Sequence, residues 1–208
     1  MFDAVIFDLD GTLIDTESVA MRVGVESFLQ MGLPADQAIF HSLIGKDAPT
    51  SNAILCAAYP QLDLEEFNRL WRGGFEAAIA TDLPLKPGAR DLLDQITLPM
   101  AICTSSHRDS AHVKLDKAGI AAAFRHVVTL EDVQNAKPHP EPYLLAAALL
   151  GADPARCLVF EDSEPGAEAA RAAGCTVIQV PDILPTDGRH AHHVARDLIN
   201  GARLVGLI

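Results

Sequence analysis

The stretch Ala4-Val5-Ile6-Phe7-Asp8-Leu9-Asp10-Gly11-Thr12 lies near the start of a chain of 208 residues. Its first four residues are all apolar, as in a strand covered by helices on both faces, and polar residues follow at once. Later apolar runs predict further strands at 100–103, 126–130, 157–160 and 176–180. Helical stretches are predicted between the later runs at 110–118, 140–150 and 165–173, each followed by a glycine. This alternation predicts an α/β fold with a parallel sheet and right-handed crossovers.

The alternation fails between the first and second runs, where the chain carries helical periodicity only. Met21, Val25, Phe28 and Leu29 are spaced as one apolar helix face. Further helices are predicted at 36–43, 50–58 and 64–80. We therefore predict a core made of residues 1–15 and 83–208, with a helical module at 16–82 inserted into it.

Composition and charge exclude several classes of function. With 49% hydrophobic and 21% charged residues, the chain has the usage of soluble globular proteins, and its longest nearly apolar stretch is too short to span a membrane. A net charge of −12 without a basic cluster disfavours nucleic acid and membrane surfaces as partners. The N-terminus has no basic region typical of a signal peptide, so we expect a cytoplasmic protein. We also expect a monomer or weak dimer. Four widely spaced cysteines without a CxxC motif indicate buried thiols.

Acidic side chains follow two of the predicted strands. Asp8 and Asp10 are two residues apart in an extended segment, so their carboxylates point the same way and repel each other unless a cation lies between them. Glu161 and Asp162 follow the run at 157–160. An all-oxygen set of carboxylates suits a hard ion such as Mg²⁺. Asp8, Asp10, Glu161 and Asp162 are therefore the predicted metal site.

Hydroxyls and one lysine complete the pattern. Thr104, Ser105 and Ser106 follow the second run, and Lys137 follows the third. Ligands of open parallel sheets bind at the carboxyl ends of the strands, where these residues are expected to meet. Mg²⁺, lysine and hydroxyl donors together are typical of a phosphoryl-binding pocket.

Four motifs resemble, in order and in context, those of the haloacid dehalogenase (HAD) superfamily. They are DLDGTLID at 8–15, ICTSS at 102–106, AKPHPEPY at 136–143 and VFEDSEPG at 159–166. The resemblance covers the whole chain and implies a HAD-like Rossmannoid core with a parallel sheet. The inserted helices resemble the C1-type cap of the phosphatase and β-phosphoglucomutase-like branch.

The resemblance also implies a mechanism and a role for each residue. Asp8 would attack phosphorus to form a phosphoaspartyl intermediate, and Asp10 would act as general acid and then as general base. Mg²⁺ would be held by Asp8, the backbone carbonyl of Asp10 and Asp162, with Glu161 beside it. Thr104 and Ser105 would bind phosphoryl oxygens, and Lys137 would neutralise charge. The implied function is a Mg²⁺-dependent phosphatase acting on a small phosphorylated metabolite such as a sugar phosphate.

Departures from the family patterns leave alternatives open. Dehalogenases lack the second acid of the first motif, which is Asp10 here. β-Phosphoglucomutases usually carry an arginine in the cap after a glycine matching Gly45, where this chain has Lys46. The absence of that arginine favours hydrolysis. Because Lys46 could partly substitute for it, a sugar phosphate mutase is the alternative. A phospho-acceptor receiver-type signalling module is more remote, since it has no helical insert after its first strand and its acid pair is adjacent; an inactive binding protein on this fold is a third alternative.

Overall fold

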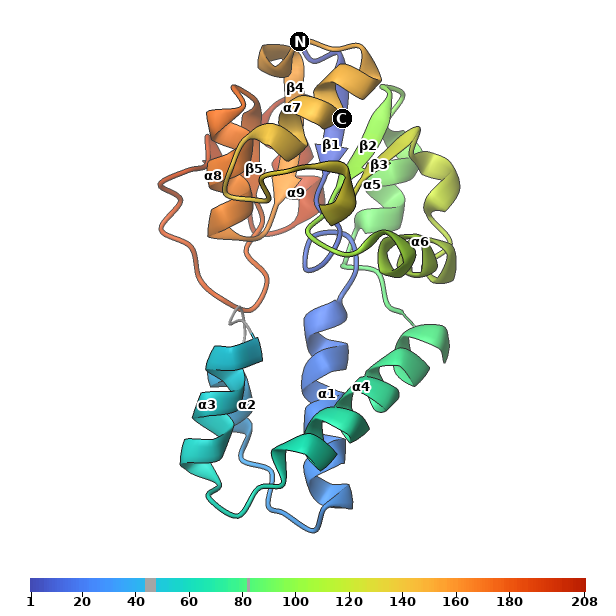
Figure 1. Ribbon diagram of the computed structural model, residues 1–208. Helices are drawn as coiled ribbons and strands as arrows, with labels where there is room; N and C mark the ends of the chain where they lie inside the picture. The colour runs from blue at the N-terminus through green and yellow to red at the C-terminus, as the bar shows by residue number, and fades with distance from the viewer. Residues whose placement is uncertain (44–47, 82) are drawn as a thin grey trace. The chain divides into compact units, whose positions relative to one another are not determined.

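The computed structural model describes residues 1–43, 48–81 and 83–208. In these residues a six-stranded sheet, with every neighbouring pair parallel, has the order β3-β2-β1-β4-β5-β6 (Figure 1). The strands are β1 (Ala4–Phe7), β2 (Met100–Cys103), β3 (His126–Val128), β4 (Cys157–Glu161), β5 (Thr176–Gln179) and β6 (His193–Val194). The predicted α/β fold with a parallel sheet is confirmed.

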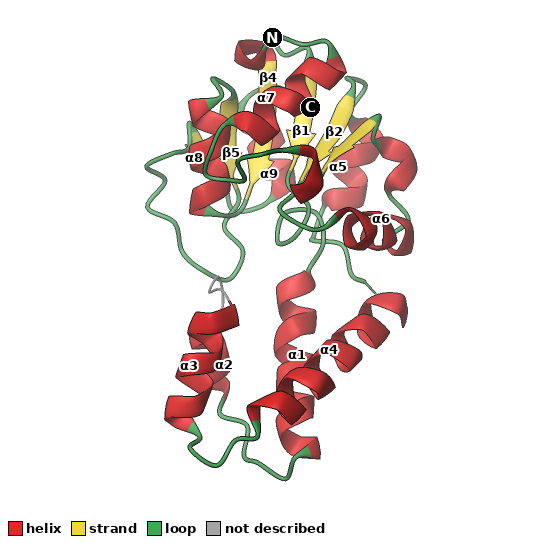
Figure 2. Cartoon of the chain, viewed as in Figure 1, coloured by secondary structure: helices red, strands yellow, loops and turns green. Residues whose placement is uncertain are grey.

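Helices cover both faces of this sheet (Figure 2). They are α5 (Ala89–Gln95), α6 (Arg108–Lys117), α7 (Glu141–Leu150), α8 (Glu164–Ala172) and α9 (Leu198–Leu204), with 3₁₀ turns at Ala121–Ala123, Leu130–Asp132 and Pro154–Arg156. Ile6 and Val159 point into a core shared with α7 and α8. Phe160 and Ile178 point to the other face, where they approach Gly201 of α9. Burial on both faces explains why the strands are continuously apolar.

Strand register brings the polar strand ends together. β1 is central, and Phe7 lies opposite Ile102 of β2 and Phe160 of β4. The backbone N–H of Asp8 donates to the carbonyl of Phe160 at 3.0 Å, so the ladder continues one residue past the strand. The residues that follow β1, β2 and β4 therefore emerge side by side at one edge of the sheet.

Residues 16–83 form a second compact unit, and residues 1–15 and 84–208 form the first. The second unit is helical: α1 (Thr16–Gln30), α2 (Gln37–Leu43), α3 (Ala48–Ala58) and α4 (Leu64–Thr81). Its core is aromatic, with Phe28 edge-on to Phe40, Tyr59 and Phe67 at ring-centroid distances of 5.0, 4.8 and 5.2 Å. The helices of this unit therefore pack around a hydrophobic core of their own.

The apolar face predicted for the first of these helices is partly wrong. Phe28 is buried, but Leu29 is 63% exposed, and Val19 and Val23 lie on the buried side instead. Gly24 belongs to that side because a Cβ there would lie 2.7 Å from the ring of Phe40. A glycine at a close contact adds nothing to a hydrophobic pattern. The pattern alone therefore does not predict the side of this helix that is buried.

Two histidines near the C-terminus lie at the edge of the sheet. His193 begins the edge strand β6. Nδ1 of His192 accepts a hydrogen bond from the backbone N–H of Val177 at 3.0 Å. Because β6 pairs with β5 through backbone groups, this edge strand forms without an apolar run.

The remaining expectations concern membranes and thiols. No helix in the described ranges is both long and apolar enough to span a bilayer. Cys103, Cys157 and Cys175 are buried free thiols, as expected, whereas Cys56 is exposed. Cys103 is buried, and burial raises the pKa of its thiol to about 12, which disfavours the reactive thiolate.

Candidate active site

Asp8, Lys137 and Glu161 form the buried centre of the site. Nζ of Lys137 donates to Oδ1 of Asp8 at 2.7 Å, to Oε1 of Glu161 at 2.7 Å and to the carbonyl of Cys103 at 2.9 Å. The lysine side chain is only 6% exposed. Burial works against its charge, but Asp8 and Glu161 raise the pKa of Lys137 well above its ordinary value. A charged ammonium therefore fixes the orientation of the Asp8 carboxylate.

Glu161 has all its hydrogen-bonding directions taken. Its Oε1 accepts from Lys137 and from the Tyr143 hydroxyl at 3.0 Å, and its Oε2 accepts from the backbone N–H and the hydroxyl of Ser163, both at 2.9 Å. The residue is fully buried. With four donors on its two oxygens, Glu161 has no lone pair directed at a metal. Glu161 therefore contacts Lys137 directly, and we propose that it orients Lys137, whereas the sequence had placed it among the metal ligands.

Asp10 has hydrogen-bond partners other than those of Asp8. Nζ of Lys114 donates to Oδ1 of Asp10 at 2.7 Å, and the Ser106 hydroxyl donates to Oδ2 at 2.7 Å. Lys114 also donates to the Ser106 oxygen at 3.0 Å. Lys114 was not among the predicted site residues, and Ser106 was expected at the strand ends but without a contact to Asp10. The missed signal was the position of Lys114 in the buried stripe of α6, between Ala111 and Leu115.

The hydroxyl loop begins at the end of β2. Thr104 is buried, and its Oγ1 accepts a hydrogen bond from the backbone N–H of Ser106 at 3.1 Å. Ser105 is exposed, and Ser106 is the serine that contacts Asp10. Ser106 thus links Thr104 to Asp10, whereas the side chain of Ser105 is exposed. His107 pairs instead with the exposed Glu131 at 2.7 Å.

Asp162 lies against the turn that follows β1. Its Oδ1 accepts from the Thr12 hydroxyl at 3.0 Å. Gly11 has a φ of 83°, and a Cβ there would lie 2.5 Å from Oδ2 of Asp162 and 3.3 Å from Oδ2 of Asp182. Only glycine fits this close approach and this backbone conformation. Asp182, which lies in the loop after β5, was not among the predicted site residues.

The family model of haloacid dehalogenase-like hydrolases matches residues 2–174. The chain belongs to the haloacid dehalogenase-like hydrolase family. Hexitol phosphatase A of Escherichia coli is 37% identical over 179 residues, which are 84% of this chain and 81% of that protein. Together with the other named phosphatases among its relatives, this identifies the chain as a phosphoric monoester hydrolase.

Solved structures of HAD-like proteins agree with the fold. A HAD family hydrolase from Deinococcus radiodurans, solved with bound phosphate and sodium, is 30% identical with a TM-score of 0.88 over 99% of this chain and 96% of that one. A putative β-phosphoglucomutase from Thermotoga maritima is 27% identical with a TM-score of 0.85 over 99% of both chains. The resemblance drawn from the four motifs is confirmed.

The residues of this HAD-like hydrolase fit a divalent cation. Asp8, Asp10, Glu161 and Asp162 carry four formal negative charges, and two of these are neutralised by the paired Lys114 and Lys137. One divalent cation would neutralise the two negative charges that remain. Burial raises the pKa of Asp8 to about 7, against the opposing effect of Lys137, and it also raises the pKa of Asp162. Both carboxylates thus lack enough positive charge among the protein's own groups.

A buried carboxylate oxygen supports the same conclusion. Oδ1 of Asp182 pairs with Lys86, but Oδ2 is buried and has no hydrogen-bond partner among the described residues. It lies beside the Asp162 oxygen at Gly11. In the described ranges no three His, Cys, Asp or Glu side chains form a cage for a metal. Mg²⁺ sites in proteins usually consist of one or two carboxylates together with waters and substrate phosphate.

One backbone position tests the role of Glu161. A Cβ on Gly166 in α8 would lie 1.6 Å from Oε1 of Glu161, so Gly166→Ala must displace that side chain. We expect this variant of the hydrolase to lose about 1–3 kcal/mol of unfolding free energy and to lose activity, as measured by urea unfolding and turnover. Gly73→Ala is the matched control, because nothing lies within 4 Å of its Cβ position in α4. Normal activity in Gly166→Ala would contradict an orienting role for Glu161.

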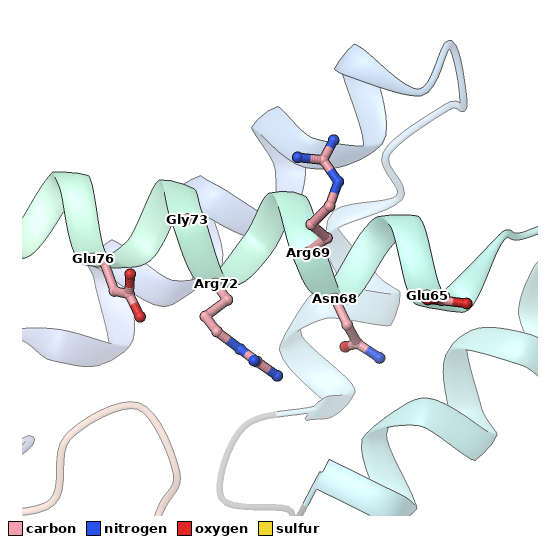
Figure 3. A pocket seen from close by; sticks show the side chains of 6 residues that line it. All are labelled: Glu65, Asn68, Arg69, Arg72, Gly73 and Glu76. Atoms are coloured by element: carbon pink, nitrogen blue, oxygen red, sulfur yellow. The ribbon is translucent and has the colours of Figure 1, made fainter.

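Two further points concern the helical unit. The cap residues compared with those of mutases, Gly45 and Lys46, lie outside the described residues. A hollow of about 550 Å³ lies on α4 and is lined by Glu65, Asn68, Arg69, Arg72, Gly73 and Glu76. In Figure 3 Asn68 and Arg72 extend to the same side of α4 and Arg69 to the other. None of the acids described above lines this hollow.

Proposed function

We propose that this chain is a Mg²⁺-dependent phosphatase that hydrolyses a small organic phosphate through a phosphoaspartyl intermediate on Asp8. The observation that carries the proposal is the Asp8 carboxylate, held at one oxygen by the buried Lys137 at 2.7 Å and lying next to Glu161 at the strand ends. Asp10, two residues away, has the separate partners Lys114 and Ser106. Two carboxylates in two different environments suit two different roles.

In the first half-reaction, the Asp8 oxygen that is not bound to Lys137 attacks phosphorus. The bond from phosphorus to the ester oxygen breaks, and Asp10 gives its proton to that oxygen, so that an alcohol leaves. Lys137 keeps the attacking carboxylate in one orientation. Such positioning supplies much of the rate in phosphoryl transfer, because little side-chain basicity is needed.

In the second half-reaction, the Asp10 carboxylate takes a proton from water as the water oxygen attacks phosphorus. The bond from phosphorus to Asp8 breaks, phosphate leaves, and the Asp8 carboxylate and the Asp10 acid are both restored. The Thr104 hydroxyl and the backbone N–H groups of its loop are the proposed donors to the phosphoryl oxygens. Ser105 can contribute its backbone to this loop, since its side chain is exposed.

Asp8, Asp162 and the backbone carbonyl of Asp10 are the groups that would hold Mg²⁺. When bound, the ion supplies positive charge to the phosphoryl oxygens and to the carboxylates. Local charge of this kind, together with Lys137, outweighs at short range the net charge of −12 that the whole chain carries. An anionic substrate is therefore compatible with an acidic protein.

The substrate class rests on the relatives. Hexitol phosphatase A is 37% identical to this chain, and a fructose-1-phosphate phosphatase from Escherichia coli is 31% identical over 86% of it. We propose a sugar phosphate or sugar alcohol phosphate as substrate. The phosphoryl group is the part of the substrate that the described site would bind. The lysine and the hydroxyls suit its oxygens, and the acids suit the roles of nucleophile, proton donor and metal ligand.

A phosphate-release screen tests the proposal. The purified chain is incubated with a panel of sugar, sugar alcohol and other metabolite phosphates, with Mg²⁺ or with EDTA, and inorganic phosphate is measured. We expect release from at least one sugar or sugar alcohol phosphate, dependent on Mg²⁺. An Asp8→Asn preparation purified in the same way controls for contaminating phosphatases. Absence of release from the whole panel with Mg²⁺ would refute the proposal.

Mutase activity is the second candidate, because the putative β-phosphoglucomutase structure covers 99% of this chain. The same preparation is given a sugar 1-phosphate with a bisphosphate primer, and formation of the 6-phosphate is measured. We expect net phosphate release to exceed isomer formation. Isomer formation without net phosphate would replace the phosphatase proposal with the mutase.

A further inference from the structure

Lys114 is an unusual residue for the surface helix α6. Its neighbours His112, Val113 and Asp116 are exposed, yet Lys114 itself is 6% exposed. Lysine is rarely buried unless it is paired, because both its charge and its flexible chain disfavour burial. Its ammonium reaches Oδ1 of Asp10 at 2.7 Å and the Ser106 oxygen at 3.0 Å. The cost of burying Lys114 is thus offset at one carboxylate, that of Asp10.

The three residues form a closed ring of hydrogen bonds. Lys114 binds one oxygen of Asp10, the Ser106 hydroxyl binds the other, and Lys114 also binds Ser106. The two donors come from different elements, since Ser106 lies in the loop after β2 and Lys114 lies in the last turn of α6. Two donors on opposite oxygens stop rotation of the carboxylate. The Asp10 side chain is still 29% exposed, so it is held without being covered.

The ring is also joined to the hydroxyl loop. The backbone N–H of Ser106 donates to Thr104 Oγ1 at 3.1 Å, while the Ser106 hydroxyl donates to Asp10. The proposed phosphoryl-binding loop and the proposed acid and base therefore share one residue. A proton donor misplaced by about 1 Å can lose about 10²-fold in rate, so a fixed position has a large effect.

We propose that Lys114, acting with Ser106, is a positioning residue that holds Asp10 for proton transfer to and from the reacting oxygens. The inference rests on the proposed function, because it assumes that Asp10 is the general acid and base. Lys114 touches no reacting atom in this scheme and acts through Asp10 alone. A purely structural ion pair would stabilise α6 without any selective effect on proton transfer, and this difference can be measured.

The test compares two substrates that differ in their need for a proton. An alkyl phosphate leaves as a strongly basic alkoxide and needs the acid, whereas p-nitrophenyl phosphate leaves as a weakly basic phenolate and does not. For Lys114→Met we expect kcat/KM on the alkyl phosphate to fall by about 10²-fold, the lower part of the range for general acid catalysis. We expect kcat/KM on p-nitrophenyl phosphate, which reports the first half-reaction, to change by less than about threefold.

The second half-reaction gives an independent measurement. With Asp10 misplaced, water attack slows for both substrates, so p-nitrophenyl phosphate should give a rapid burst of one nitrophenolate per enzyme. Ser106→Ala removes the other donor to Asp10, and we expect the same selective pattern with a loss of about tenfold on the alkyl phosphate. It also serves if Lys114→Met folds poorly. Lys117→Met, an exposed lysine of the same helix, is the control expected to match the wild type.

The outcomes separate this inference from the function on which it rests. Equal losses on both substrates, or no loss, in Lys114→Met and in Ser106→Ala would overturn the positioning role while leaving the phosphatase intact. A wild-type enzyme without turnover of either ester, or an Asp8→Asn variant as active as the wild type, would instead overturn the proposed function. A selective loss with a burst supports both.

Discussion

Replacing Asp8 with asparagine is expected to reduce turnover by about 10⁴-fold or more, as removal of a nucleophile does in other enzymes. The amide of asparagine cannot form the acyl phosphate, although it has nearly the same shape as the carboxylate. Its oxygen can still accept the hydrogen bond from Lys137, which lies 2.7 Å from Oδ1 of Asp8. We therefore expect loss of activity without loss of fold, measured as phosphate release beside thermal unfolding.

The same variant tests the cation without using activity. If Asp8 holds Mg²⁺, adding the ion should raise the melting temperature of the wild type, because a ligand that binds only the folded state stabilises it. In Asp8→Asn the increase should be smaller, and EDTA should abolish it in both proteins. The exposed Asp94→Asn is a matched control for the change from acid to amide. Retention of more than about a tenth of the activity in Asp8→Asn, with mass spectrometry excluding deamidation, would remove Asp8 as nucleophile.

The fold was predictable where burial leaves a continuous signal. β1 and β2 match their apolar runs, because central parallel strands are covered on both faces. Gly119, Gly151 and Gly174 have φ values of 65°, 67° and 91°, as expected of the glycines that follow these helices.

The fold was not predictable where tertiary contacts replace the local pattern. β6 has two exposed residues and pairs only through its backbone. α9 contains Gly201, which disfavours a helix by propensity, but a Cβ there would lie 2.7 Å from Ile178. The close packing of α9 on the sheet therefore requires the residue that hides the helix from sequence analysis.

The candidate site divides in the same way. Asp8, Asp10 and Lys137 belong to short motifs, so the sequence alone was enough to name them as candidates. Their roles as nucleophile, as general acid and base, and as the orienting cation remain a proposal. Lys114 lies 104 residues from Asp10 and belongs to none of the four motifs, so only the packing of α6 reveals it. Glu161 was among the predicted site residues, but its contacts could not be predicted, because the four donors around it come from three separate residues.

Lys137→Met is expected to have the largest effect on stability. Lys137 is the ammonium shared by Asp8 and Glu161, with both distances at 2.7 Å and its side chain 6% exposed. Removing one partner of a buried ion pair costs about 3–5 kcal/mol, because the remaining charge has no compensation. Methionine retains the apolar stem, so the loss comes mainly from the ammonium. We expect a loss of this size in urea unfolding, and a fall in kcat of about 10²–10³-fold, since a preorganised charge is lost as well.

The double variant Lys137→Met with Glu161→Gln shows whether the loss comes from charge or from packing. Glu161 is fully buried, and without Lys137 its Oε1 keeps only the Tyr143 hydroxyl as donor. Removing the negative charge of Glu161 should therefore restore part of the stability lost in Lys137→Met, although Glu161→Gln alone destabilises the protein. Activity should not return, because Asp8 still lacks the donor that orients it. Additive losses of stability in the two single variants would show that Lys137 and Glu161 act independently, and the site would then have to be redrawn without the shared ammonium.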